Sequence, residues 1–521
     1  MHRSRKDPAG RAGLIACAIT GLLLPLLALE PTAAAKTTKT LKVPARVQEF
    51  APITATTTFT PAKPGTKVVV QLKSGSSWTK VAQGKQNAKG KTTLTFRAPI
   101  AGTYFYRART INTKGKITAT TAKKRVVVTQ RKTRLVSRPQ MTPPRYGQAN
   151  RSSGLPSISG NGRWVAYSSS ADNLVKGDLN KTGDVFLTDT KTGKTLLVSR
   201  TPAGKSANRG ASSPSISANG RYVVFESRSD DMVAGEAISS NTGIYRFDRV
   251  TKKVVRVTKG SNLSYASISD SGNLVVYNSH AIASDITLLA DLSAQPTTTT
   301  TIPCETLGNP CRSRWARISA DGKSVALAST DSRVGATPSR EEIFVYDVAT
   351  EAIERVSPLT GDNDSGYPDI SANGRYVVYQ SEATNLIAGE TNTTTSLYRY
   401  DRVLDQTVRV SKAVGGGFLN IAPGRNLFPR ISGDGSAVAY ISKATNISPK
   451  AKSGLMHAYV FSVSTGKTAL VSVTPQGKAG NGASDSPVLS HNGKIVAFQS
   501  VATNLVPLDK NAAWDVFRRA L

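Results

Sequence analysis

A short phrase that joins a polar turn to an apolar β-branched run recurs seven times in this 521-residue chain, and it constrains the fold more than any other feature. The copy at 157–167 reads Ser-Ile-Ser-Gly-Asn-Gly-Arg-Trp-Val-Ala-Tyr, and the copy at 215–225 follows it closely. Five further copies surround Gly272, Gly322, Gly374, Gly435 and Gly493, so that successive turn glycines are 50 to 61 residues apart. A period of this length indicates repeated supersecondary units that stack on one another.

Each copy predicts a β-hairpin, because Asn-Gly, Asp-Gly or Ser-Gly between β-branched runs supplies the positive-φ residues of a tight turn. The second run, for example 376–379, is apolar at successive positions, as in a strand that is covered on both faces. A third strand such as 244–247 and a fourth such as 254–257 follow in most copies. Four strands in about 50 residues are typical of a propeller blade. The sequence therefore predicts an all-β chain with a seven-bladed β-propeller over 131–521.

The two ends of this region predict how the ring closes. The seventh copy stops after its third strand at 516–518, so its fourth strand is missing. Before the first copy, the segment 134–138 matches the fourth strand of the first repeat at 196–200. We expect 134–138 to complete the last blade, because this pairing removes two exposed strand edges.

Residues 36–130 lack the repeat and show short strand signals separated by glycine turns, which predicts a small β-sandwich. This segment holds 19 Lys and Arg but a single acid, Glu49, in a chain whose net charge is +34. Such a field attracts polyanions, and an anionic cell-wall polymer is the expected partner. A solvated basic surface without a specific partner is the alternative, and nucleic acid is not expected because no RRM, OB or helix-turn-helix signature is present. The candidate polyanion-binding residues are Lys114, Lys116, Lys123, Lys124 and Arg125.

The N-terminus predicts export. Four basic residues precede an apolar run at 14–29, and Ala33-Ala34-Ala35 offers a small-residue cleavage site, so 1–35 is expected to be a signal peptide and the mature chain to have no transmembrane span. A retained membrane anchor is the alternative reading. The mature chain keeps Cys304 and Cys311, and we expect them to form a local disulfide in the oxidising environment outside the cell. The expected location is extracellular or associated with the cell envelope.

The Ser-x-Asn/Asp-Gly-Arg/Lys hairpin followed by an apolar run resembles the PD40 repeat of the TolB-like, WD40-like propellers over about 131–521. The segment 101–108 resembles bacterial immunoglobulin-like modules. The first resemblance implies a propeller, and propellers of this family serve as interaction platforms, enzyme-associated domains and occasionally lyases. The architecture therefore leaves the function open.

One segment is similar to the beginning of a calcium-binding loop. Asp178, Asn180, Thr182 and Asp184 place oxygen atoms at alternate positions around Gly183, and 509–515 is a weaker copy. The alternative is an Asx-rich turn, because the terminal Glu of a full loop is missing. Calcium is thus the one cofactor that the sequence suggests, and no other is expected.

Linear motifs for catalysis are absent from the sequence: there is no Gly-x-Ser-x-Gly, no His-Glu-x-x-His and no phosphate-binding loop. The histidines His280, His457 and His491 lie in different contexts and are expected to be surface or loop residues. These observations predict that the chain is not an enzyme but a secreted binding protein, whose propeller is a platform for a protein or a glycan. The alternative is a polysaccharide-active or hydrolytic enzyme that uses the propeller channel.

Overall fold

The computed structural model describes residues 37–99, 101–139, 147–235, 242–260, 262–280, 285–294, 296–302, 312–330, 340–358, 361–390, 394–421, 427–451, 454–507 and 509–521. All the secondary structure in these ranges is β, in strands β1 to β37, which confirms the all-β prediction. The predicted signal peptide 1–35 and both cysteines of the predicted disulfide, Cys304 and Cys311, lie outside the described residues.

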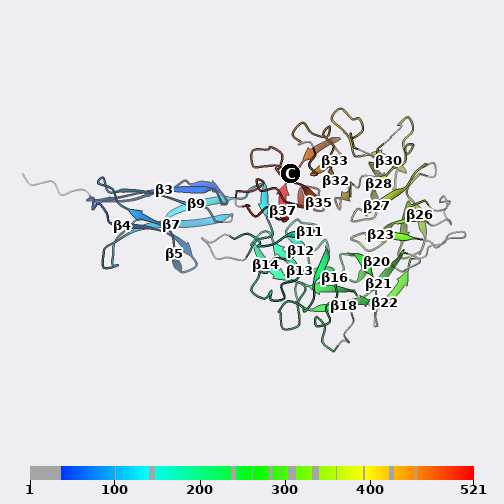
Figure 1. Cartoon of the computed structure of the whole chain (residues 1–521), viewed down its shortest axis with the longest axis horizontal. Coiled ribbons are helices and arrows are strands. Elements are labelled where there is room, and N and C mark those ends of the chain that lie inside the picture. The colour runs from blue at the N-terminus through cyan, green and yellow to red at the C-terminus, as the bar shows by residue number, and fades with distance from the viewer. Residues whose placement is uncertain are drawn as a thin grey trace, which may run out of the picture.

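Seven four-stranded antiparallel sheets form a ring around a common centre (Figure 1). The first three sheets are β11 (Ser153–Ile158), β12 (Trp164–Ser169), β13 (Asp184–Asp189) and β14 (Lys194–Leu197); β15 (Ala211–Ile216), β16 (Tyr222–Ser227), β17 (Gly243–Asp248) and β18 (Val254–Lys259); and β19 (Leu263–Ile268), β20 (Leu274–His280), β21 (Asp285–Asp291) and β22 (Thr298–Thr301). The next three are β23 (Ser313–Ile318), β24 (Ser324–Ser329), β25 (Glu342–Asp347) and β26 (Ile353–Arg355); β27 (Ser365–Ile370), β28 (Tyr376–Ser381), β29 (Ser396–Asp401) and β30 (Gln406–Arg409); and β31 (Arg430–Ile431), β32 (Ala437–Ser442), β33 (His457–Ser462) and β34 (Lys467–Leu470).

The seventh sheet joins both ends of this region. It contains β35 (Ser484–Leu489), β36 (Ile495–Ser500) and β37 (Asp515–Ala520), and its fourth strand is β10 (Thr133–Leu135), which precedes all the other sheets in the chain. Leu135 is opposite Phe517, and the Ser137 hydroxyl donates a hydrogen bond of 2.6 Å to the Asp515 carboxylate. No sheet of the ring is therefore left with three strands.

Buried apolar side chains between neighbouring sheets hold the ring together. The second strand of each sheet is apolar on both faces, and in β16 the side chains of 223–225 are all fully buried. An aromatic residue on the second strand stacks on one from the third strand in five sheets, for example Tyr440 on Tyr459 with ring centroids 5.7 Å apart. Such offset pairs add specific geometry to the burial of apolar surface.

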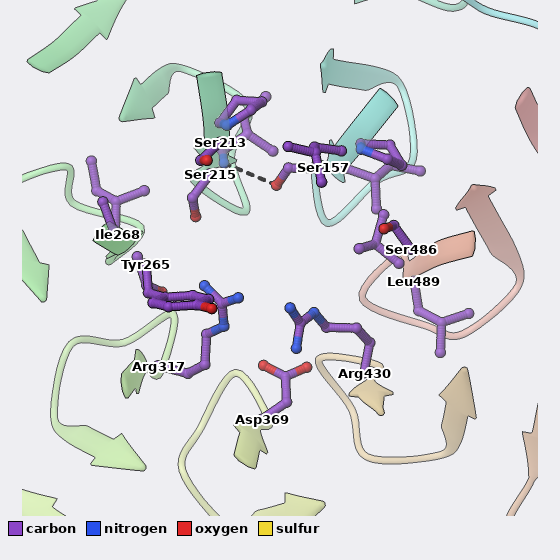
Figure 2. Close-up of a pocket in the computed structure, with 18 of the residues that line it drawn as sticks. Ser157, Ser213, Ser215, Tyr265, Ile268, Arg317, Asp369, Arg430, Ser486 and Leu489 are labelled. Carbon is purple, nitrogen blue, oxygen red and sulfur yellow. Dashed lines mark hydrogen bonds between the residues drawn. The ribbon is translucent and has the colours of Figure 1, made fainter. Parts of the chain in front are cut away.

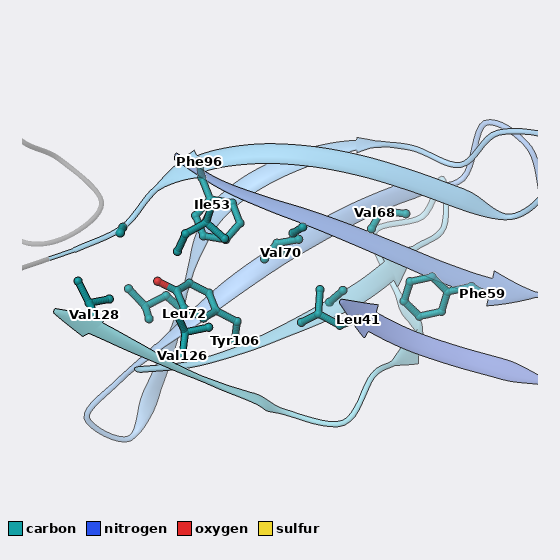
Figure 3. Close-up of a cluster of buried hydrophobic side chains, with 13 residues drawn as sticks. Leu41, Ile53, Phe59, Val68, Val70, Leu72, Phe96, Tyr106, Val126 and Val128 are labelled. Atoms are coloured by element: carbon teal, nitrogen blue, oxygen red, sulfur yellow. The ribbon is translucent and has the colours of Figure 1, made fainter. Parts of the chain in front are cut away.

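The N-terminal segment forms two further sheets whose facing side chains make a separate core (Figure 3). One sheet contains β1 (Thr38–Lys42), β3 (Pro52–Thr60) and β6 (Lys91–Arg97). The other contains β2 (Arg46–Gln48), β4 (Lys67–Ser74), β5 (Ser77–Lys85), β7 (Gly102–Ile111), β8 (Ile117–Thr120) and β9 (Lys124–Thr129).

A buried ion pair connects this segment to the ring. The carboxylate of Glu49 is fully buried and lies 3.0 Å from Nε of Arg134, which is 6 % exposed and belongs to β10. Glu49 also accepts hydrogen bonds from the amides of Ala101 and Arg131. The only acid of the basic segment thus lies at its junction with the strand that closes the ring.

Candidate functional site

The innermost strands of the ring surround a cavity of about 830 Å³ on the central axis. Its walls include residues from β11, β15, β19, β23, β27 and β35 and from the chain around β31, so all seven sheets contribute. A ligand in this cavity could contact side chains from several sheets at once, so we treat the cavity, called the channel below, as the candidate site.

A backbone irregularity recurs in every innermost strand. A non-glycine residue near the strand's start has a φ between 44° and 58°, and in six strands the register shifts at the same place. Such bulges redirect side chains and are frequent beside functional sites. The next residue is proline in five of the seven strands, and this proline is the sequence signal that predicts the bulge. The seven positive-φ residues are Leu155, Ser213, Tyr265, Trp315, Tyr367, Phe428 and Ser486.

Four consecutive members of this set are aromatic, and we call Tyr265, Trp315, Tyr367 and Phe428 the aromatic arc. The rings of Trp315 and Tyr367 are stacked with centroids 4.1 Å apart, and Tyr367 meets Phe428 edge-on at 4.9 Å. Tyr265 and Phe428 line the cavity and are 42 % and 36 % exposed. Tyr265 and Phe428 thus offer ring surface to a ligand, whereas the Trp315 ring is covered by Tyr367 and by the Arg314 guanidinium, 4.2 Å from its centroid.

In three of these strands, the residue two positions after the positive-φ residue is charged, and its side chain points toward the middle of the channel (Figure 2). These are Arg317, Asp369 and Arg430, from three adjacent sheets, whereas Ser157 and Ser215 hold this position on the opposite side. The Asp369 carboxylate accepts a hydrogen bond from the amide of Ile431, at 2.9 Å. The guanidinium of Arg317 has no hydrogen-bond partner among the described residues, and burial together with the charge of Arg430 lowers its pKa to about 10. Arg317 therefore stays charged at neutral pH and can accept an anionic ligand.

A serine, a histidine and an aspartate form a chain of hydrogen bonds in the channel wall. The Ser264 hydroxyl lies 2.5 Å from Nε2 of His280, and Nδ1 of His280 lies 2.7 Å from the carboxylate of Asp285. Antiparallel pairing explains the arrangement: His280 ends β20 directly opposite Asp285, which begins β21, and Ser264 lies on β19 on the other side of β20. Because an ionised carboxylate only accepts, Nδ1 carries the proton and Nε2 is left to accept the hydroxyl proton of Ser264.

Glu226 is a further acidic group of the same cavity. Its carboxylate accepts the amide of Tyr265 at 3.0 Å, and burial raises its pKa to about 7, against the opposing charges of Arg317 and His280. Carboxylates, histidine and arginines thus converge on one channel.

Part of the calcium-like segment is buried in the structure. The side chains of Asp178 and Asp184 are buried, and Asn180 lies between them in sequence with its amide donating to the carbonyl of Ala207 at 2.6 Å. Thr182 is exposed, and its backbone amide donates a hydrogen bond to Asn180 Oδ1. Burial raises the pKa of Asp184 to about 7, and the charge of Asp178 adds to this shift.

The predicted polyanion-binding side chains are exposed but are not gathered at one point. Lys114 and Lys116 lie in the turn between β7 and β8, whereas Lys124 and Arg125 pair with Tyr106 and Phe105 near the other end of β7. Lys123 lies over the Phe105 ring at 5.4 Å. They form a basic edge along the sheet rather than a pocket.

Of the three histidines, His457 differs most from the expected surface or loop residues. His280 is in the channel wall, and His457 is fully buried in β33 with Nδ1 3.2 Å from the Ser472 hydroxyl. His491 lies in a hairpin turn at the edge of the cavity. None of the described segments contains a helix of the length and apolar character needed to cross a membrane.

Comparisons with known proteins identify similar folds but no family. No protein-family model matches the sequence, and no curated protein matches it either. Among solved structures, an oligogalacturonate lyase in complex with manganese has a TM-score of 0.46 at 10 % identity, over 71 % of this chain and 90 % of the lyase. A putative TolB from Agrobacterium tumefaciens has a TM-score of 0.33 at 16 % identity, over 51 % and 83 %. An acylaminoacyl peptidase complex has a TM-score of 0.40 at 12 % identity, over 67 % and 49 %. The chain is thus similar to β-propellers in fold.

The prediction that the chain is not an enzyme is corrected by these comparisons, because a lyase and a peptidase are among the similar structures. The prediction depended on linear motifs. In a ring of sheets, by contrast, groups that are adjacent in space come from strands that are distant in sequence, so an enzyme of this architecture needs no such motif.

Proposed function

We propose that the chain is a secreted hydrolytic enzyme whose active site lies in the channel of a seven-bladed propeller, with Ser264 as the nucleophile. The observation that carries this proposal is the continuous hydrogen-bonded chain from Ser264 through His280 to Asp285 in the wall of the cavity. A hydroxyl bonded to an imidazole, which is itself oriented by a carboxylate, is the arrangement that activates serine for acyl transfer on unrelated folds.

The proposed reaction is hydrolysis of an ester. Ser264 Oγ attacks the carbonyl carbon while its proton passes to Nε2 of His280, and Asp285 stabilises the resulting imidazolium. His280 then gives this proton to the leaving alkoxide, so that an alcohol departs and an acyl-serine remains. A water molecule loses a proton to His280 and attacks the acyl carbon, and the carboxylic acid leaves as the proton returns to Ser264. Arg317, whose guanidinium lines the same cavity, would stabilise negative charge on the carbonyl oxygen.

The cavity favours an acylated acidic carbohydrate as the substrate. Tyr265 and Phe428 offer apolar ring surface, and the serines on the opposite wall offer hydroxyls for hydrogen bonds. Arg317 and Arg430 provide two cations, of which at most one is balanced by Asp369. A sugar ring that carries hydroxyls, an anionic group and an ester satisfies all three kinds of contact.

The N-terminal segment is proposed to be an immunoglobulin-like module that associates with an anionic cell-envelope polymer. Its exposed basic edge, formed by Lys114, Lys116, Lys123, Lys124 and Arg125, supports this role electrostatically. Export by the segment 1–35 would bring the module to such polymers. We expect added salt to weaken the retention of this segment on anionic cell envelopes, and retention that does not depend on salt would contradict the proposal.

The enzymatic proposal is tested by ester hydrolysis with a matched pair of serine variants. Ser264→Ala removes the nucleophile, whereas Ser212→Ala removes the serine at the same position of the neighbouring innermost strand, β15. On a panel of p-nitrophenyl and acetylated-glycan esters, we expect the wild type and Ser212→Ala to hydrolyse at least one member and Ser264→Ala to lose at least a thousandfold in kcat. Equal rates for Ser264→Ala and the wild type would overturn the proposal.

A further inference from the structure

Two carboxylates in the first sheet are buried without enough partners. Asp178 is 5 % exposed and Asp184 is fully buried. Among the described residues, both oxygens of Asp178 and Oδ2 of Asp184 have no hydrogen-bond partner, and Oδ1 of Asp184 accepts a hydrogen bond of 2.5 Å from the Ser199 hydroxyl. Burying a carboxylate without a partner is costly, so an unpartnered pair of carboxylates needs a further explanation.

The same arrangement recurs in the sheet that closes the ring. Asp509 and Asp515 are 3 % and 0 % exposed, and Oδ2 of each has no hydrogen-bond partner in the part of the chain that the structure describes. Oδ1 of Asp515 accepts a hydrogen bond of 2.6 Å from the Ser137 hydroxyl, as Asp184 does from Ser199. Asn511 donates to the carbonyl of Ala149 at 3.0 Å, as Asn180 does to Ala207.

The backbone between the two aspartates also matches in the two sheets. In both segments an asparagine accepts the amide two residues later, and the residue between them has a positive φ, 58° at Lys181 and 52° at Ala512. Two segments with different surrounding residues thus have the same turn and the same unpartnered acids. Chance burial of a carboxylate in one loop would not produce this repetition.

Other sheets show how an acid at this position is normally compensated. The first residue of the third strand is Asp184 in β13 and Asp515 in β37, and it is also acidic in β21 and β25. In β25, Glu342 forms an ion pair of 2.5 Å with Arg355, and in β21, Asp285 lies 4.0 Å from the Arg314 guanidinium and accepts a hydrogen bond from His280. In β13 and β37 no cationic side chain pairs with the aspartate among the described residues, although a second aspartate is present. A bound cation would supply the partner that the described residues do not provide.

We infer that the pairs Asp178–Asp184 and Asp509–Asp515 are two equivalent binding sites for a divalent cation that prefers oxygen ligands, Ca²⁺ in the first place. Two carboxylates supply the charge, and neutral oxygens of the turn and of the nearby serine complete a set of hard ligands. The described residues contain no group of three or more His, Cys, Asp or Glu for a metal, so each proposed site depends on two carboxylates and neutral oxygens.

The second site also implies a structural role. Ser137, which bonds Asp515, follows β10, and Gln148, whose amide donates to Asp509 at 3.2 Å, lies beyond it in the chain. A cation at Asp509 and Asp515 would therefore hold the closing strand to the last sheet. Because binding occurs only in the folded ring, calcium is expected to raise the melting temperature. This inference does not depend on the chemistry of the channel.

The test is calorimetric titration of CaCl₂ into the full chain after treatment with a chelator. We expect two equivalents to bind, Asp184→Asn and Asp515→Asn to bind one each, and the double variant to bind none. The control Asp291→Asn, at the end of β21, is expected to bind two. Because Asn is nearly isosteric with Asp and carries no charge, the variants should melt no lower than the wild type in chelator, but without the increase on adding calcium.

Two results would overturn the inference. One is the absence of binding heat and of any melting shift for the wild type at millimolar calcium. The other is calcium binding by the double variant that equals binding by the wild type. If Asp184→Asn or Asp515→Asn does not fold, the pair Asp178→Asn and Asp509→Asn tests the same sites, because these side chains make fewer hydrogen bonds.

Discussion

The substitution Glu49→Gln tests the junction between the N-terminal segment and the ring. The Glu49 carboxylate balances the charge of Arg134, whose side chain is only 6 % exposed, and accepts two backbone amides. Glutamine keeps the shape but removes the negative charge, so a guanidinium stays buried without its counter-ion, and one amide faces an NH₂ group. Removing one partner of a buried ion pair costs about 3–5 kcal/mol. This is a large part of the stability of a typical domain, about 5–15 kcal/mol.

The loss can be measured by urea unfolding followed by hydrogen exchange of the amides at 133–137. We expect Glu49→Gln to lower the free energy of unfolding by about 3–5 kcal/mol and to increase exchange in this strand. The double variant Glu49→Gln/Arg134→Met should lose less than the single one, because it leaves no unpaired charge. Glu351→Gln, on an exposed turn, is the control and should have no effect. A loss below about 1 kcal/mol for Glu49→Gln, or a double variant less stable than the single one, would refute the reasoning.

Three further predictions concern the ring and its channel. Gly435→Ala should destabilise the fold by about 1–3 kcal/mol, because φ is +72° and the added Cβ would overlap the Tyr376 ring, whereas Gly389→Ala, at φ +80° with open space around it, should cost less in the same thermal melts. Burial raises the pKa of Glu226 from 4.5 to about 7, so the folded chain holds this proton at a pH where the unfolded chain has lost it, and the free energy of unfolding falls as the pH rises from 4.5 to 7. Glu226→Gln should remove on the order of 2 kcal/mol of that fall. Unfolding curves with an unchanged pH dependence would be the contrary result. Phe428→Ala should raise KM for a glycan ester about tenfold with little change in kcat, measured by steady-state kinetics, because the Phe428 ring lines the cavity and would contact the sugar ring rather than the reacting atoms.

The repeat made most of the architecture predictable, because each hairpin is a local feature. Asn-Gly between β-branched runs specifies a turn whatever the rest of the chain does, and Gly220 has the positive φ that such a turn requires. The junction was not predictable in this way. Glu49 was recognisable as the only acid of a basic segment, but its burial against Arg134 depends on how two separate folding units meet.

The candidate site was predictable only in part, because it depends on register. Ser264 and His280 are 16 residues apart, and they meet only because β19 and β20 pair with a bulge beside Ser264. No spacing rule in the sequence gives this contact, and His280 was therefore expected to be a surface residue. The calcium-like pattern of Asp178 and Asp184 is local and can be read from the sequence, and calcium binding there stays a prediction. The hydrogen bond from Ser199 to Asp184 could not be read in this way, because that serine follows the next strand.

Covalent trapping of the channel serine tests the central claim most directly. The full chain is incubated with a fluorophosphonate, and the modified peptide is identified by mass spectrometry. The account predicts stoichiometric modification of Ser264, strong loss of labelling in His280→Ala, and no labelling in Ser264→Ala, while Ser212→Ala is labelled like the wild type. An unmodified Ser264 in the folded wild-type chain, or equal labelling in His280→Ala, would contradict it.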